Sequence, residues 1–116
     1  MTSSPSVALE AVDRILNRGG DADDVLREVV AVLVARGGCS WAGIAFVEEG
    51  SLVLGPEAGV ADEGRRERLE IAYRGEKVGE LWADGAPDRA VLERVGVLVS
   101  AHVLLGWDTG GEGWEP

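Results

Sequence analysis

The chain has 116 residues, of which 46% are apolar and 28% are charged, so it has the size and composition of one folded domain. Its formal net charge is −10, from 21 acidic and 11 basic residues, and such a chain repels nucleic-acid phosphates and anionic membrane surfaces. The single cysteine, Cys39, excludes an intramolecular disulfide and a zinc site built on several thiolates. We therefore expect no nucleic-acid partner, no membrane association, and no metal or cofactor.

The sequence also shows no export signal and no membrane span. Its apolar stretches fall far short of the roughly 20 residues that cross a bilayer, and residues 1–6 lack the basic start and apolar run of a signal peptide. These features predict a cytoplasmic protein. We expect a flexible start over residues 1–6, one domain over residues 7–106, and a flexible, acidic, Gly-rich tail over residues 107–116.

Three segments have the apolar periodicity of helices. Residues 7–17 form an amphipathic pattern that ends at Gly19-Gly20. A broader apolar stripe predicts a helix over residues 22–36, with Asp21 as its N-cap. The third helix is predicted over about residues 87–106, because Pro87 suits a first turn. Its apolar arc is so wide that it needs cover on more than one side.

The first predicted hairpin follows the second helix. Residues 40–48 alternate between two apolar faces, which predicts a central strand covered on both sides. A tight turn at Glu49-Gly50 leads into a strand over residues 51–54. We expect Gly55-Pro56 to end this strand, because proline cannot continue a hydrogen-bonded ladder.

A second hairpin is predicted from two short strands, residues 69–73 and 78–83, joined by a turn at Gly75. Residues 56–67 are rich in charge and glycine and predict a loop. The expected fold class is α+β: the two hairpins form one antiparallel four-stranded sheet, and the N-terminal and C-terminal helices pack on one face of it.

Both hairpin segments resemble hairpins of GAF domains. Residues 41–56 read WAGIAFVEEGSLVLGP, and this segment is especially similar to the first hairpin of the free methionine-R-sulfoxide reductase branch. Residues 69–84 read LEIAYRGEKVGELWAD and resemble the GAF closing hairpin, with its Gly-x-Leu pattern at Gly79 and Leu81. The resemblance spans about residues 8–106 and implies a GAF or PAS-like scaffold.

One departure from the GAF pattern concerns the ligand pocket. A full GAF domain carries a long segment between its hairpins that roofs the pocket, whereas only about a dozen residues join Pro56 to Arg68 here. The resemblance therefore implies the scaffold and carries over no cyclic-nucleotide or chromophore site. The reductase branch places its catalytic cysteines in and around the stretch that is shortened here. Cys39 instead precedes the first strand and matches none of them.

The remaining candidates for chemistry are single residues. Cys39 has no second thiol to resolve an oxidised intermediate, which favours a small apolar residue at a strand start. His102 is the only histidine and falls within the apolar stripe of the last helix. Without a partner for metal binding or base catalysis, it is interpreted as a packed or interface residue. We expect no catalytic residue and no enzymatic activity.

A ligand site is possible on the sheet face that the helices leave open. Aromatic side chains on the strands could line a shallow pocket, although ordinary core packing explains them as well. The arginines at 65, 66 and 68 could meet an anionic group or only neutralise neighbouring acidic residues. The candidate ligand-binding residues are Trp41, Phe46, Arg65, Arg68, Tyr73 and Trp82.

The leading hypothesis is a GAF-like binding and dimerisation module, non-catalytic and signalling or regulatory. We expect a homodimer through the first and last helices, because one thin sheet cannot cover the apolar arc of the last helix. The candidate interface residues are Leu9, Val12, Leu16, Val91, Val95, Leu98, His102 and Leu105. One alternative is a small-molecule sensor that binds its ligand between the sheet and the loop 56–67. The other is an enzyme, a degenerate methionine sulfoxide reductase.

Overall fold

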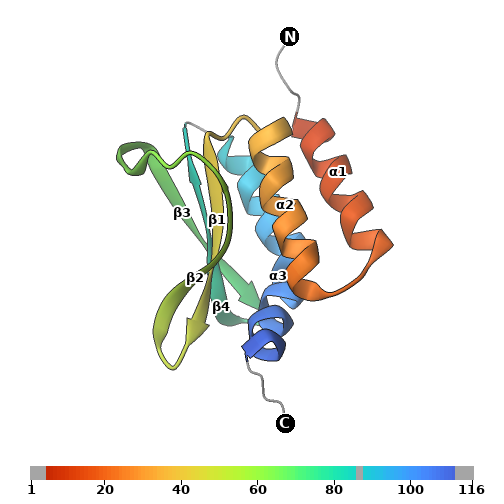
Figure 1. The fold of residues 1–116 in the computed structure, drawn as a ribbon, viewed down its shortest axis with the longest axis vertical. Helices are drawn as coiled ribbons and strands as arrows, with labels where there is room; N and C mark the ends of the chain where they lie inside the picture. The colour runs from red at the N-terminus through yellow and green to blue at the C-terminus, as the bar shows by residue number, and fades with distance from the viewer. Residues whose placement is uncertain (1–4, 86–87, 112–116) are drawn as a thin grey trace.

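Three helices lie on one face of a four-stranded antiparallel sheet (Figure 1). This computed structural model describes the backbone of residues 5–85 and 88–111 and the side chains of residues 7–85 and 88–104. The strand order β2-β1-β4-β3 joins two hairpins, which confirms the predicted α+β class. The elements are α1 (Pro5–Arg18), α2 (Ala22–Arg36), β1 (Trp41–Glu48), β2 (Ser51–Gly59), the 3-10 turn η1 (Glu63–Arg65), β3 (Arg66–Tyr73), β4 (Glu76–Asp84) and α3 (Arg89–Gly111).

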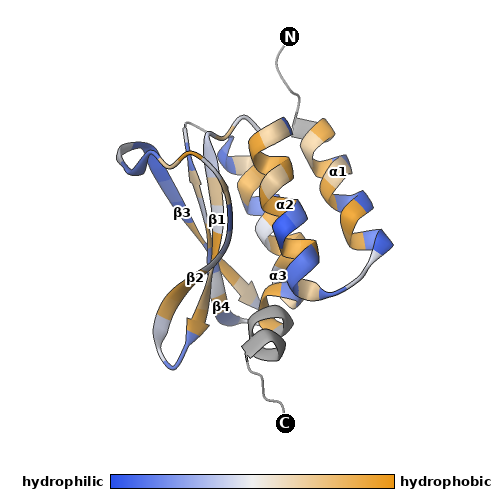
Figure 2. Ribbon diagram, in the orientation of Figure 1, coloured by the Kyte–Doolittle hydropathy of each residue, from blue (hydrophilic) through white to orange (hydrophobic). Residues whose placement is uncertain are grey.

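The helices form two layers over the sheet. Helix α2 packs mainly on β2 and β1, α3 packs mainly on β3 and β4, and α1 lies outside them against both helices (Figure 1). Helix α1 therefore buries one stripe at helical spacing, formed by Ala8, Val12 and Ile15. Helix α2 lies between α1 and the sheet and buries more of its surface. Hydrophobic residues run along the facing sides of the helices, whereas hydrophilic residues gather at the α1–α2 turn and the start of β3 (Figure 2).

Strand β1 has the burial expected of a central strand, because every residue from Trp41 to Phe46 is buried. Ala42, Ile44 and Phe46 face the helices and belong to the main core, together with residues of β3 and β4. The residues that alternate with them, Trp41, Gly43 and Ala45, are also buried and face the opposite side of the sheet. The sheet is therefore covered on both sides at this strand.

Both hairpins close through two-residue turns with positive φ at both positions. The φ angles are 52° and 84° at Glu49 and Gly50, and 54° and 86° at Arg74 and Gly75. Such turns match the right-handed twist of the strands they join. The predicted turn positions are confirmed.

The expectation that Gly55-Pro56 ends the second strand is wrong. Strand β2 continues to Gly59, because Gly55 and Pro56 lie opposite the single residue Ile44 in a β-bulge. A proline is tolerated there since β2 is an edge strand. The predicted loop over residues 56–67 is correspondingly short and consists of residues 60–62 and η1.

The helix ends follow the sequence signals in part. Helix α2 has its predicted bounds, but Asp21 occupies the N-cap without a side-chain capping bond. Helix α3 begins at Arg89, where Asp88 Oδ1 accepts hydrogen bonds from the backbone N–H groups of Ala90 (2.9 Å) and Val91 (3.3 Å). Pro87 lies outside the described residues. Helix α3 extends to Gly111, beyond the predicted end near residue 106.

The expected flexible ends fall mostly on residues that the structure does not describe, apart from the helical residues 5–6 and 107–111. Among the described residues, no helix has both the length and the apolarity needed to cross a membrane.

We expect Gly79→Ala to destabilise the fold by about 1–3 kcal/mol, the usual cost of overpacking a core. A Cβ at this position of β4 would collide with the carbonyl oxygen of Ala45 and would lie 3.0 Å from a methyl carbon of Val103. Urea unfolding monitored by circular dichroism measures the change. The control is Gly64→Ala in η1, where a Cβ has only Asp62 Oδ1 nearby, at 3.8 Å. Equal stabilities of the two variants would contradict the packing argument.

Candidate functional site

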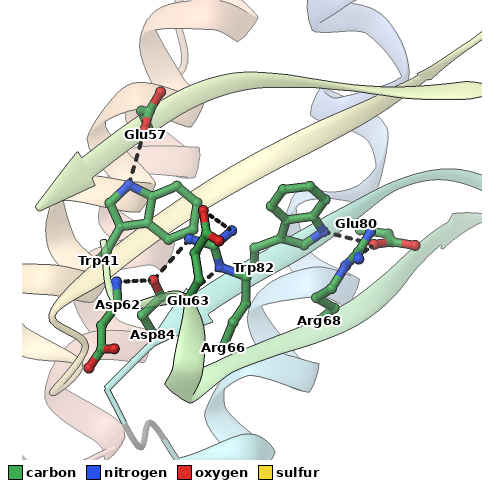
Figure 3. Close-up of polar contacts among 9 residues, drawn as sticks. All are labelled: Trp41, Glu57, Asp62, Glu63, Arg66, Arg68, Glu80, Trp82 and Asp84. Atoms are coloured by element: carbon green, nitrogen blue, oxygen red, sulfur yellow. Dashed lines mark hydrogen bonds and ion pairs between the residues drawn. The ribbon is translucent and has the colours of Figure 1, made fainter. Parts of the chain in front are cut away.

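The face of the sheet that points away from the helices carries two rows of aromatic and charged side chains (Figure 3). The strand register places both Trp41 and Arg66 opposite Asp84, and places Arg68 opposite Trp82. Directly opposed residues of antiparallel strands share one face of a sheet. The two rows therefore lie side by side at the end of the sheet that η1 borders.

The first row is built on an ion pair between Arg66 and Asp84. Arg66 donates from Nε to Asp84 Oδ1 (2.7 Å) and from Nη2 to Oδ2 (3.0 Å), which is a bidentate pair. Asp84 is 0% exposed, and Oδ2 also accepts the backbone N–H of Asp62 (2.6 Å). These hydrogen bonds lower the pKa of Asp84 below its ordinary value although burial opposes the shift, and they raise the pKa of Arg66.

Two tryptophan rings flank the guanidinium group of Arg66. The Arg66 Cζ atom lies 4.2 Å from the ring centroid of Trp41 and 5.5 Å from that of Trp82. Trp41 is only 3% exposed, and its Nε1 donates to the carboxylate of Glu57 on β2 (3.0 Å). A cation over an aromatic face is attracted by the ring quadrupole, and more strongly when both are desolvated. The chain's own arginine therefore occupies the space between the rings.

The second row, Arg68 and Trp82, contacts Glu80, which lies next to it on the same face of β4. Arg68 lies 4.4 Å from the Trp82 ring centroid and donates from Nε to Glu80 Oε1 (3.1 Å). Glu80 also accepts hydrogen bonds from Trp82 Nε1 and Lys77 Nζ, each at 2.7 Å. Burial alone would raise the pKa of Glu80, but these hydrogen bonds and nearby positive charges lower it. Each buried polar group of this row thus has a partner within the chain.

Only half of the predicted ligand residues come together on this face, namely Trp41, Arg68 and Trp82. Phe46 lies in the core beneath the helices. Tyr73 ends β3 at the far hairpin turn, and Arg65 is exposed on η1 near Asp62. The expectation that these three line the same pocket is wrong, because strand alternation and position along the sheet separate them.

The central pair, Arg66 and Asp84, was not among the sequence candidates. Asp84 follows an apolar strand and precedes Gly85, so it resembles an ordinary turn residue. Arg66 was only one of three arginines in a charged stretch. The signal that the sequence offers is a polar residue, Asp84, at the end of a buried strand, and this signal does not identify Arg66 as its partner.

The residues predicted for the dimer interface differ in how far they are buried within the single chain. Val12, Val91 and Val95 are buried within the single chain, so the expectation that they form a dimer surface is corrected. They face the protein's own core because α3 is covered by the sheet on one side and by α1 and α2 on the other. Leu9, Leu16, Leu98 and His102 are half-buried, and the side chain of Leu105 lies outside the described residues. Among the described atoms, His102 Nδ1 is buried without a hydrogen-bond partner.

Cys39 is a buried thiol just before β1. Burial, together with the negative charge of Asp84, raises its pKa to about 11. Because the thiolate is the nucleophilic form, such a cysteine is poorly reactive. Within residues 7–85 and 88–104, no three His, Cys, Asp or Glu side chains form a group that could hold a metal ion.

We expect Arg66→Leu to lower the free energy of unfolding by about 3–5 kcal/mol at pH 7, because it leaves the buried Asp84 carboxylate without its cation. The folded-state pKa of Asp84 is depressed in the wild type, so the pair's contribution is complete above the unfolded pKa near 3.9 and is lost as pH falls through the lower folded pKa. The stability difference between the two proteins therefore shrinks at acid pH.

Urea titrations from pH 7 to pH 3 measure this difference. Arg65→Leu is the control. Arg65 is exposed and its ion pair is long, with 4.0 Å between Nη1 and Asp62 Oδ2, so its loss should change the free energy of unfolding by less than about 1 kcal/mol. A cost of Arg66→Leu that is constant across this range would contradict the role assigned to the Asp84 charge.

Neither a protein-family model nor a curated protein sequence matches the chain. Similar solved structures include fRMsr of Staphylococcus aureus in complex with its substrate, at 13% identity and TM-score 0.70, covering 89% of this chain and 97% of that chain. Free methionine-R-sulfoxide reductase from Neisseria meningitidis matches at 17% identity and TM-score 0.66, covering 89% of this chain and 93% of that one.

The GAF domain of an Acinetobacter phosphoenolpyruvate-protein phosphotransferase is a further similar structure. It shares 14% identity and a TM-score of 0.67, covering 90% of this chain and 97% of that chain. Similar folds thus occur both in reductases and in GAF domains of another class of protein. The chain described here has the GAF fold.

Proposed function

We propose that this chain is a non-catalytic GAF-fold module that forms a homodimer and serves in signalling or regulation. The observation that carries the proposal is the closed sheet face, where Arg66 pairs with Asp84 and lies between Trp41 and Trp82. A face filled by its own side chains has no room for a substrate between these rings. What remains available on the chain is its outer surface, which favours a role in association.

The enzyme alternative would require a reactive thiol. Cys39 is 5% exposed and its raised pKa keeps it protonated near neutral pH. One of the similar structures is a reductase in complex with its substrate. A shared fold does not imply a shared activity, because function depends on the residues of the site. The buried thiol supports the non-catalytic proposal.

The sensor alternative would require a ligand between the sheet and the short loop. Such a ligand would have to displace Arg66 from the buried carboxylate of Asp84, which also holds the backbone of Asp62. Breaking that pair costs far more than separating an exposed one. This cost favours the association module over the sensor.

Among the helical side chains that the structure describes, the most exposed large apolar one lies on α3. Val97 is 66% exposed, and Leu104 and Val7 are also exposed on α3 and α1. A dimer surface on the helices would use these residues together with the half-buried Leu98 and His102. Of these residues, Leu98 and His102 belong to the interface predicted from the sequence, and Val97 extends it along α3.

At tens of micromolar in physiological salt we expect the protein to have twice its chain mass of 12.2 kDa. Light scattering on a size-exclusion column measures this. Val97→Asp should shift the equilibrium toward monomer, because it places a charge at an apolar contact. Val60→Asp, at a 78% exposed loop position, is the matched control. A wild-type mass of one chain would overturn the proposal.

The Cys39 thiol of the native protein should react with a thiol reagent at least about a hundredfold more slowly than free cysteine at pH 8. With a pKa of about 11, about 0.1% of the thiol is ionised at that pH, against roughly a quarter at an ordinary pKa of 8.5. In denaturing urea the rate should rise to that of free cysteine. Rapid labelling of the folded protein would revive the enzyme alternative.

A further inference from the structure

Strand β3 forms an edge of the sheet with an unused row of backbone groups. Within the described residues, no strand pairs with its outer side. The backbone N–H of Gly85 donates to the carbonyl of Arg65 (3.3 Å), which directs the main chain of Arg65 toward β4. Backbone direction alternates along an antiparallel strand, so the N–H and C=O groups of Arg66, Arg68 and Glu70 point outward.

We propose that this edge pairs antiparallel with β3 of a second copy of the chain, with Leu69 of both copies at the two-fold axis. Arg68 then lies opposite Glu70 of the partner subunit, and the two sheets become one. This inference rests on the proposed homodimer and names its surface.

The charge pattern of the strand selects this register. Arg66, Arg68 and Glu70 lie on the same face, two residues apart. A two-fold axis at residue 68 would place two Arg68 side chains opposite each other, and an axis at residue 70 would do the same with two Glu70 side chains. Of these three registers, only an axis at residue 69 pairs opposite charges across the edge without placing like charges directly opposite each other.

Glu70 also has no ion-pair partner in the part of the chain that the structure describes. It is exposed, makes no ion pair among the described residues, and lies opposite Glu80 of β4. Like charges directly opposite each other destabilise a sheet. Arg68 donates from Nε to Glu80, and its two Nη groups make no hydrogen bond among the described residues. The guanidinium group can therefore hold Glu80 with Nε and Glu70 of the partner subunit with Nη.

Helix α3 adds an apolar surface beside the same edge. An open groove of about 370 Å³ runs between α3 and β3, with Leu69, Leu92, Gly96 and Val97 among its lining residues. Joining two β3 edges puts both α3 helices on one face of the continuous sheet. The second copy's α3 then covers the exposed Val97, which links the strand edge to the helical surface of the proposed dimer.

The test is Glu70→Arg, measured by sedimentation velocity over a concentration series. The substitution places an arginine opposite Glu80 within the chain, so thermal stability at concentrations below the dimer range should rise. It also places two arginines across the dimer edge, so the dimer dissociation constant should rise roughly tenfold or more. A merely structural role for Glu70 would predict the first effect without the second.

Arg68→Glu provides the complementary variant, with its fold checked by circular dichroism. It should dimerise weakly alone, but an equimolar mixture with Glu70→Arg should form a heterodimer, because each Arg then faces a Glu. Glu76→Arg, an exposed position on β4, makes the same change in net charge and should leave the dimer intact.

The outcomes separate this inference from the proposed function. A Glu70→Arg protein that dimerises as tightly as the wild type, or a mixture that does not associate, overturns the β3 edge and leaves a homodimer on another surface. A monomeric wild type overturns both. Weakened single variants whose mixture associates support the β3 pairing.

Discussion

The buried carboxylate of Asp84 is the constraint on which the arrangement of the sheet end depends. It accepts two hydrogen bonds from Arg66 on β3 and one from the backbone N–H of Asp62. The backbone carbonyl of Asp84 accepts a hydrogen bond from the N–H of Ser40, just before β1. A buried charge is stable only when such partners surround it. Asp84 therefore connects the start of β1, the end of β4, the start of β3 and the short loop before it.

A buried ion pair of this kind adds little net stability over an apolar pair of the same shape, because desolvation consumes most of the attraction. The ion pair instead determines how the side chains at this end of the sheet are arranged. With Arg66 on Asp84, the guanidinium group lies against Trp41 and excludes other occupants from that position. A domain with so few residues between its hairpins cannot roof a deep pocket. The side chain of Arg66 on β3 covers this part of the sheet instead.

The sequence predicted the elements better than the site. Apolar periodicity and paired glycines located the helices, and the Glu49-Gly50 and Arg74-Gly75 turns located the hairpins. The site depends on register, which a β-bulge beside Val78 shifts by one residue: Tyr73 pairs with Glu76, yet Ile71 pairs with Gly79. Counting back from the turn without that bulge would place Arg66 opposite Ala83, on the wrong face. Gly79 next to Val78 is typical of a bulge or of a close backbone approach, and the sequence does not distinguish the two.

The net charge of −10 bears on how two copies could meet, because two acidic chains repel at long range. The short stretch that holds Arg65, Arg66 and Arg68 carries three of the 11 basic residues of the chain and lies at the start of β3. These arginines partly offset the acidic residues of the same stretch, Asp62, Glu63, Glu67 and Glu70. Salt screens the long-range repulsion over about 8–10 Å near physiological ionic strength, while pairs in direct contact are screened less. Moderate salt should therefore favour an edge-paired dimer, in contrast to an association that rests on long-range attraction between oppositely charged surfaces.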